Sequence, residues 1–246
     1  FIHRMDADDI MLREKLQHLI KIKNNSNSSL STGKIKYAGL KLKRGFLDYE
    51  QWVNDQSAQN FWVNIYYECP LISPCWLADR SLVEEYLSHT DLMYPEDYFF
   101  AFFLYSKRIV PSVSSDYLHI WRDHDTRASR IDDHYLEQAF LPLKLHFLFN
   151  HDRDTRPLLL WGAGRKGKAL AQMLKKMNKP FLWTSNNPEK VGKQIYSIEI
   201  LPEPSIHSIG QYQTILAFSA PSEKEAMQLQ LDMGDLMRNQ DYFWFY

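Results

Sequence analysis

The chain has 246 residues, of which 45% are hydrophobic, enough to form the core of one large domain or two small ones. Its 29 basic and 30 acidic side chains nearly cancel, which excludes the strong positive field of a nucleic-acid-binding protein. Only two cysteines are present, too few for a disulfide framework, so a reducing cytoplasm is expected. No apolar run reaches the roughly 18 residues that a membrane-spanning helix needs.

The first stretch, residues 1–10, is apolar and then places three carboxylates within four positions, at Asp6, Asp8 and Asp9. Like charges spaced so closely repel one another, and a divalent cation would neutralise them. A solvated acidic turn explains the same spacing equally well, because Asp is common in turns. Since the chain starts with Phe1 inside a predicted strand, we expect a fragment that lacks its N-terminal part.

Four segments of the first half have interpretable patterns. Residues 12–23 carry apolar side chains every three or four positions, which predicts an amphipathic helix. Residues 34–43 alternate apolar and basic side chains, which predicts strands with one solvated face. The aromatic-rich segment 49–67 predicts one or two helices. Two prolines within residues 69–76 predict a loop that leads into a short strand.

A helix is predicted over residues 79–89, and another begins near Pro95 and continues through an apolar segment to residue 105. Proline suits the first turn of a helix, and acidic side chains there complement the helix dipole. Glu96 and Asp97 are therefore expected at a helix N-terminus, where a rigid backbone can direct a carboxylate into a cleft.

Strands are predicted at residues 109–113 and 117–121, followed by a loop rich in ionisable side chains at 122–130. A long apolar helix is predicted at residues 133–149. The charged segment 150–157 has no apolar period, which indicates a domain boundary.

The domains expected on this basis are residues 1–150 and 151–246. In the second, a buried strand at 158–161 leads into a G-x-G-x-x-G turn and a helix at 169–177, with a further strand at 180–184, as in a βαβ unit. Another strand is predicted at 214–218 and a final helix at 223–238.

Three segments, in this order, resemble the second half of a family 2 glycosyltransferase: Arg4-Met5-Asp6-Ala7-Asp8-Asp9, Pro95-Glu96-Asp97-Tyr98 and residues 121–130. The resemblance covers residues 1 to about 150. It implies an α/β protein with a partial GT-A (nucleotide-diphospho-sugar transferase) domain, here followed by a small Rossmann-like βαβ domain.

The activity that this resemblance implies is inverting, metal-dependent transfer of a sugar from a nucleotide-sugar donor to a hydroxyl of a saccharide or lipid-linked acceptor. Such enzymes commonly build surface polysaccharide, so the expected place is the cytoplasm, with peripheral association at the inner face of the membrane as one option. Nucleic acid is not an expected partner.

By the same resemblance, Asp6 and Asp8 form the D-x-D motif that binds Mn²⁺ or Mg²⁺ and the ribose, with Asp8 as the direct ligand and Asp6 nearer the ribose. Asp9 is instead expected to cap the following helix. Asp97 resembles the general base that removes a proton from the acceptor hydroxyl, and Glu96 stands beside it as its partner.

The remaining roles concern the two substrates. His124 matches a family position near the diphosphate or the metal, and the arginines expected to contact the donor are Arg4, Arg127 and Arg130. A surface loop held by ion pairs is the alternative for residues 122–130. Ser73 and Trp76 fall where the acceptor pocket usually forms, although Trp76 is equally interpretable as a core residue.

The glycine turn has its own alternatives. The backbone amides of Gly162, Gly164 and Gly167, together with the start of a helix, are suited to holding a pyrophosphate. No acidic residue stands about 20 positions further on to bind a ribose hydroxyl, so bound NAD is not expected. A Rossmann-like accessory domain without NAD is the first interpretation and a nucleotide or sugar-nucleotide regulatory site the second. The other options are a nicotinamide-dependent oxidoreductase and an interaction module.

The interaction module would form a homodimer through the aromatic C-terminus, residues 242–246. So much apolar surface is costly to expose unless a partner covers it. Burial of these side chains in the domain's own core is the simpler expectation.

Overall fold

The computed structural model of the chain describes residues 1–89, 95–124 and 139–246, except for the side chains of residues 206 and 207. The chain forms two compact units: the first contains residues 1–65 and 69–140, and the second contains residues 66–68 and 141–246. Each unit has a mixed sheet with helices, which agrees with the predicted α/β class. None of the described helices is long and apolar enough to cross a membrane.

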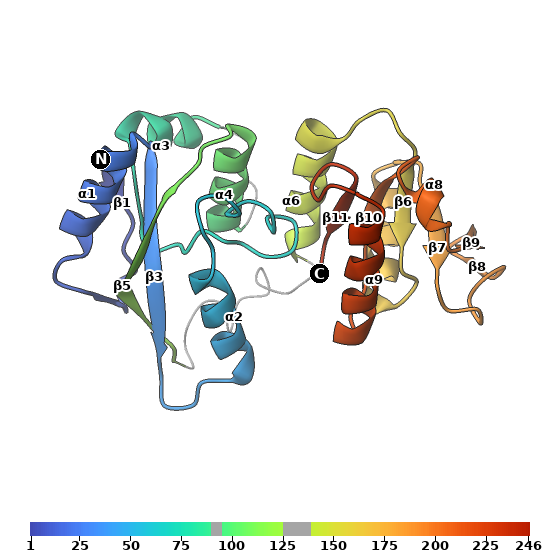
Figure 1. Cartoon of the computed structure of the whole chain (residues 1–246), viewed down its shortest axis with the longest axis horizontal. Helices are drawn as coiled ribbons and strands as arrows, with labels where there is room; N and C mark the ends of the chain where they lie inside the picture. The colour runs from blue at the N-terminus through green and yellow to red at the C-terminus, as the bar shows by residue number, and fades with distance from the viewer. Residues whose placement is uncertain (90–94, 125–138) are drawn as a thin grey trace. The chain divides into compact units, whose positions relative to one another are not determined.

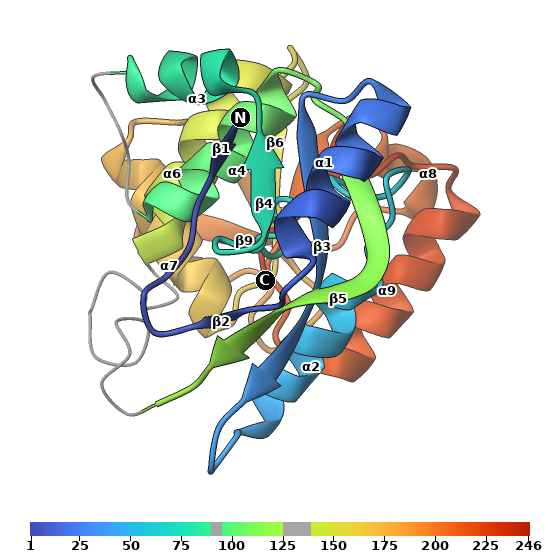
Figure 2. The same ribbon diagram turned by 90° about the vertical axis from the view of Figure 1, so that its left-hand side faces the viewer.

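The sheet of the first unit has five strands in the order β1-β4-β3-β5-β2 (Figure 2). Its two long central strands, β3 and β5, run parallel, whereas every other neighbouring pair is antiparallel. The strand bounds are Ile2–His3 (β1), Ile10–Met11 (β2), Leu30–Ala38 (β3), Trp76–Ala78 (β4) and Ser112–Arg122 (β5).

The described helices of this unit lie around the sheet, with α1 on one side and both α2 and α4 on the other (Figure 1). The apolar faces of α1 and α2 meet the sheet in a core that includes Leu19, Ile35, Val53 and Leu118. Burial of such side chains is the main favourable term in folding. The helix bounds are Lys15–Ser26 (α1), Arg44–Asn54 (α2), Arg80–Leu87 (α3) and Glu96–Ser106 (α4).

The strand prediction for residues 34–43 is wrong in part, and the prediction of one or two helices within residues 49–67 is confirmed for one helix. The strand pattern of residues 34–43 continues beyond the real strand, because Ala38 pairs with Arg122, the last residue of β5, and no strand in the described ranges pairs with the chain further on. Leu40 is accordingly fully exposed. Helix α2 ends at Asn54, and residues 58–67 form turns instead of a second helix. Two of their aromatic side chains, Phe61 and Tyr66, are buried by tertiary contacts, which do not require helical periodicity.

In place of the two strands predicted at 109–113 and 117–121 the structure has the single strand β5, which begins at Ser112 and has two register shifts against β3. The long helix predicted at 133–149 is described from residue 139 onward. There α6 covers Phe140–Phe147 and continues as a π-helix over Leu148–Asp152. These turns belong to the second unit, whose first main segment begins at residue 141 and not at the predicted boundary.

The second unit has a six-stranded sheet in the order β11-β10-β6-β7-β9-β8, in which only the pair β8 and β9 is antiparallel (Figure 1). The strand bounds are Leu158–Trp161 (β6), Leu182–Ser185 (β7), Gln194–Ile195 (β8), Ile198–Pro202 (β9), Gln213–Leu216 (β10) and Tyr242–Trp244 (β11). The helix bounds are Arg165–Lys176 (α7), Ile206–Ile209 (α8) and Pro221–Met233 (α9).

The predicted order of elements in the second unit is confirmed from β6 to β7 and again from β10 to the last helix. The last helix ends at Met233, before Gly234, and not at the predicted residue 238. The aromatic side chains of residues 242–246 are all buried, and they pack within this unit. The simpler expectation for the aromatic end is therefore confirmed, and the homodimer itself stays a prediction.

Candidate functional site

Arg4 connects the two acidic segments that the sequence singles out. Its Nη2 donates a hydrogen bond to Oε1 of Glu96 at 3.2 Å, and its Nε lies 3.5 Å from Oδ1 of Asp6. Burial lowers the pKa of Arg4, but the Asp6 and Glu96 carboxylates raise it by more, so the net shift is upward. The D-x-D strand end and the start of α4 therefore meet at one guanidinium group.

Asp97 lies in the first turn of α4, as predicted. Burial disfavours its charged form, and together with the adjacent Glu96 carboxylate it raises the pKa of Asp97 to about 6. The N–H of Tyr98 donates to Oδ1 of Asp97 at 2.8 Å, and that bond and the Arg4 cation oppose the rise. Such a carboxyl can take up or release a proton near neutral pH, which the great majority of Asp side chains cannot do.

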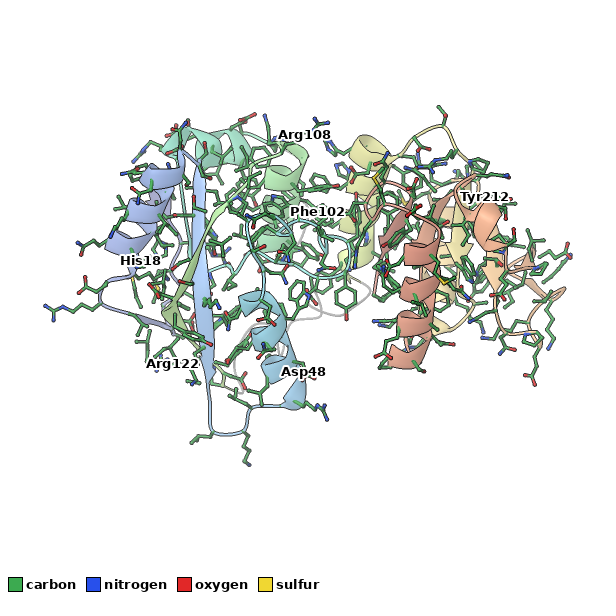
Figure 3. The ribbon with its side chains drawn as sticks, viewed as in Figure 1. His18, Asp48, Phe102, Arg108, Arg122 and Tyr212 are labelled. Atoms are coloured by element: carbon green, nitrogen blue, oxygen red, sulfur yellow. The ribbon has the colours of Figure 1, made fainter. Side chains whose placement is uncertain are left out.

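Asp8 and His124 are in direct contact. Oδ2 of Asp8 lies 2.6 Å from Nε2 of His124, and both side chains are partly exposed. Arg122 lies at the end of β5 (Figure 3), and its Nε donates to the backbone carbonyl of Asp8. The predicted partners Asp8 and His124 therefore do come together, whereas Arg127 and Arg130 lie outside the described residues.

A divalent metal fits this set of donors only in part. Asp6 and Asp8 supply the oxygen ligands that Mn²⁺ and Mg²⁺ prefer, and both are partly exposed. Within the described ranges, no three His, Cys, Asp or Glu side chains converge as a complete metal site. Mg²⁺ in phosphate-transfer sites is usually held by one or two carboxylates together with substrate phosphates, so the pair suits a site that the donor completes.

Asp9 does not cap a helix, because α1 begins only at Lys15 and follows Glu14. Its carboxylate is instead bound on both sides. Oδ2 of Asp9 lies 2.9 Å from Nε2 of His119, and Oδ1 accepts the backbone N–H of Arg122 at 2.8 Å. The Asp9 and His119 side chains are 1% and 0% exposed, so this bond anchors the acidic turn to β5 in the interior.

Lys15 extends this chain of hydrogen bonds and is itself fully buried. Its Nζ lies 3.0 Å from Nδ1 of His119 and donates to the carbonyl of Pro74 at 2.5 Å. Since an ammonium group can only donate, Nδ1 of His119 must accept, and Nε2 carries the proton that faces Asp9. The loop around Pro74 and the acidic turn are thus joined through two buried side chains.

The sequence did not indicate Lys15 or His119 as site residues. Lys15 falls among charged residues of an amphipathic pattern, where a solvated position is the usual expectation. Only the depth of its side chain in the folded unit distinguishes it, and burial lowers its pKa accordingly.

The two predicted acceptor residues are both buried. The ring of Trp76 packs on Phe100 of α4 with ring centroids 4.9 Å apart, which favours its interpretation as a core residue. Its backbone carbonyl accepts a hydrogen bond from Nδ1 of His3 at 2.5 Å. Ser73, three positions earlier, has a buried hydroxyl that finds no hydrogen-bond partner among the residues that the structure describes.

The glycine turn follows β6 in the second unit. Gly162 has a φ of +119°, and a Cβ there would lie 2.8 Å from the carbonyl oxygen of Ala217. A Cβ on Gly167 would lie 1.8 Å from the oxygen of Gly162. The start of α7 can therefore pack this closely on the glycine turn only because position 167 has no side chain. A Cβ on Gly164 would meet no atom within 4 Å. Packing therefore requires the first and third glycines, whether or not a ligand binds.

The end of β7 lies beside this turn in the sheet order and carries no acidic side chain. Ser185 closes the strand, and its Oγ accepts the N–H of Asn187 at 3.1 Å. Lys190 reaches back and donates to the carbonyl of Ala163 at 3.0 Å.

No family model matches this chain, and no curated protein gives a significant match. The resemblance to a glycosyltransferase family accordingly depends on the three sequence segments and on the contacts between the described ones.

Proposed function

We propose that the first unit is part of an inverting, metal-dependent glycosyltransferase with a GT-A fold. It would move a sugar from a nucleotide-sugar donor to a hydroxyl of a saccharide or lipid-linked acceptor. The observation that carries this proposal is the contact of Arg4 with both Asp6 and Glu96, because it brings two acidic motifs of the family together in space.

In this proposal Asp97 acts as the general base. It accepts the proton of the acceptor hydroxyl while that oxygen forms a bond to the anomeric carbon and the bond from this carbon to the diphosphate oxygen breaks. The departing diphosphate keeps the bonding electrons, and attack from the opposite face inverts the configuration. The pKa of Asp97, near 6, supports this role, because the carboxylate form predominates at neutral pH while remaining basic enough to take a proton.

Asp8 and Asp6 would hold the donor end of the site. A Mn²⁺ or Mg²⁺ ion bound there would supply positive charge that offsets the charge of the leaving diphosphate. His124 keeps the Asp8 carboxylate in place through its contact at 2.6 Å, and Arg4 holds Asp6 relative to α4. The buried pair of Asp9 and His119 fixes the turn from behind.

The second unit is, in the same proposal, a Rossmann-like accessory domain. Its parallel strands β9, β7, β6, β10 and β11 lie side by side in that order, the arrangement of dinucleotide-binding folds. Because Ser185 ends β7 where such folds place an acidic residue for the ribose, NAD is not the expected ligand. Titration of NADH fluorescence against the chain tests this, and saturable binding would favour the oxidoreductase alternative.

Calorimetry tests the proposed function directly, with UDP-, GDP-, dTDP- and CMP-sugars titrated in the presence and absence of Mn²⁺. We expect one class of nucleotide sugar to bind in a Mn²⁺-dependent manner, and Asp8→Ala to weaken that binding by about tenfold or more, since a charged ligand group is lost. Asp116→Ala is the matched control. Asp116 lies on β5 and, like Asp8, pairs with a histidine, because its carboxylate is 3.3 Å from His18 of α1.

Failure of all four classes of nucleotide sugar to bind would contradict the proposal. Equal losses in Asp8→Ala and Asp116→Ala would remove Asp8 from the site. A role in surface polysaccharide synthesis at the inner face of the membrane belongs to the same proposal and depends on which acceptor is found.

A further inference from the structure

Four buried polar atoms of the first unit have no hydrogen-bond partner among the described residues, and three of them come from segments around Arg4 and Trp76. These three are Nε2 of His3, Oγ of Ser73 and Oε2 of Glu96. Buried polar atoms are nearly always paired, because leaving one unpaired forfeits its bonds to water without replacement. A group of such atoms therefore points to a partner that the described part of the chain does not supply.

The position of His3 defines what its free nitrogen can do. Nδ1 of His3 faces the carbonyl of Trp76 at 2.5 Å and must donate, because a carbonyl oxygen only accepts. Burial lowers the pKa of His3, so the ring is neutral and Nε2 carries a lone pair. The free atom of His3 is consequently an acceptor that requires an O–H or N–H donor.

The other two atoms belong to segments that contact the same strand or the adjacent Arg4. Oε1 of Glu96 is bound by Arg4, which leaves Oε2 as a second free acceptor. Ser73 precedes β4 by three residues, and its hydroxyl can donate as well as accept. Since β1 pairs with β4 and the Trp76 ring packs on Phe100 of α4, the segments of His3 and Glu96 both lie beside the strand that Ser73 precedes.

The chemistry of these atoms selects among ligands. Phosphate oxygens are acceptors, so they cannot donate a hydrogen bond to the lone pairs of His3 and Glu96. A lipid chain has no polar hydrogen or oxygen and would leave all three atoms unpaired. Sugar hydroxyls both donate and accept, so neighbouring hydroxyls on one ring can satisfy two acceptors and one serine. Glu96 also immediately precedes Asp97, the proposed base.

We propose that His3, Ser73 and Glu96 form a hydroxyl-binding subsite, and that the acceptor is recognised through a saccharide ring and not through a lipid or phosphate group. This inference rests on the proposed function and adds His3 as a specificity-determining residue that sequence reasoning missed.

The experiment titrates the chain with methyl glycosides of glucose, galactose, mannose and N-acetylglucosamine in the absence of any nucleotide sugar. Binding is measured by saturation-transfer NMR. Two variants separate recognition from folding. Asn in place of His3 can still donate to the Trp76 carbonyl but lacks a group at Nε2, whereas Gln places its amide oxygen near Nε2 and gives up the Trp76 bond. We expect His3→Asn to weaken glycoside binding by about tenfold, the effect of one lost hydrogen bond, and His3→Gln to weaken it less.

A purely structural His3 predicts the reverse order, because only His3→Gln loses the bond to Trp76. Ser73→Ala should also weaken binding, while Ser106→Ala, at the far end of α4 and bound to the Phe103 carbonyl, should not. The inference is overturned if the unmodified chain binds none of the four glycosides, or if His3→Asn binds them as tightly as the unmodified chain does. Nucleotide-sugar binding with Mn²⁺, measured separately, shows whether the proposed function fails as well.

Discussion

Arg4 donates a hydrogen bond to Glu96 across 3.2 Å, although 92 positions separate the two residues in the sequence. The Arg4 cation also lowers the pKa of Asp97, against the larger effects of burial and of Glu96. We therefore expect Arg4→Met to raise the pKa of Asp97 further and to move the acid limb of the pH–rate profile to higher pH. Arg4→Lys should restore part of the shift, because it keeps the charge but not the planar fork.

The measurement for Arg4 is the midpoint of the Asp97 carboxyl signal in a ¹³C NMR titration. The stability of Arg4→Met should change by less than about 1 kcal/mol, because both partners of the ion pair are more than a third exposed and water screens them. An unchanged Asp97 midpoint would show that the Arg4 charge does not act on this carboxyl.

Asp97 should make the first unit less stable as pH rises. Its pKa is raised from 3.8 to about 6 in the folded chain, so the folded state keeps its proton where the unfolded state has already lost it. Unfolding then releases a proton between about pH 4 and 6, and stability falls across that window as pH increases. The Asn side chain of Asp97→Asn cannot ionise. The variant's free energy of unfolding should therefore exceed that of the unmodified chain by near zero below pH 4 and by about 2–3 kcal/mol above pH 6.

Urea unfolding of the Asp97→Asn variant between pH 4 and 8 checks this, with Asp116→Asn as the surface control. The same variant should lose about 10²-fold or more of any transfer activity, the usual contribution of a general base. A stability difference that does not depend on pH would mean that Asp97 titrates normally and is a poor candidate for the base.

Ser73→Ala should not destabilise the chain. Its hydroxyl is buried and has no partner within the described ranges, so deleting the oxygen removes a cost and leaves stability unchanged or higher by up to about 1 kcal/mol. Ser31→Ala is the matched comparison, because Ser31 is also buried but donates to the Leu19 carbonyl at 3.0 Å. Its loss should cost about 1 kcal/mol in denaturant unfolding. A comparable loss in both variants would show that Ser73 has a partner in solution.

Gly167 and Gly164 should respond differently to alanine. A Cβ at position 167 would lie 1.8 Å from the Gly162 oxygen, a backbone atom that cannot move without displacing the turn. Gly167→Ala should therefore cost about 3 kcal/mol or more, comparable to severe core overpacking, or prevent the second unit from folding. Gly164→Ala meets no atom within 4 Å and should change stability by less than about 1 kcal/mol.

Circular dichroism during guanidinium unfolding distinguishes the two glycine variants. A Gly167→Ala variant as stable as Gly164→Ala would mean that α7 and the turn are further apart than in the described structure.

Much of the local structure could be predicted, because it depends on residues close in sequence. Proline followed by two acids starts α4 in the expected place, since fixed φ and the helix dipole act within one turn. Alternating and apolar runs similarly located most strands of both units. The end of β3 could not be predicted, because it depends on where β5 stops and not on residues 39–43 themselves.

For the candidate site, the sequence by itself determined which acids are adjacent, namely Asp6 with Asp8 and Glu96 with Asp97. Only the tertiary structure decided their environment. The pairing of strands and helices brings Arg4 to Glu96 and buries Lys15 against His119, and burial in turn sets the pKa of Asp97. Spacing along the sequence shows which acidic side chains are neighbours. Electrostatic interaction and desolvation act through space between segments about a hundred residues apart, so only the folded chain could reveal their effect on these acids.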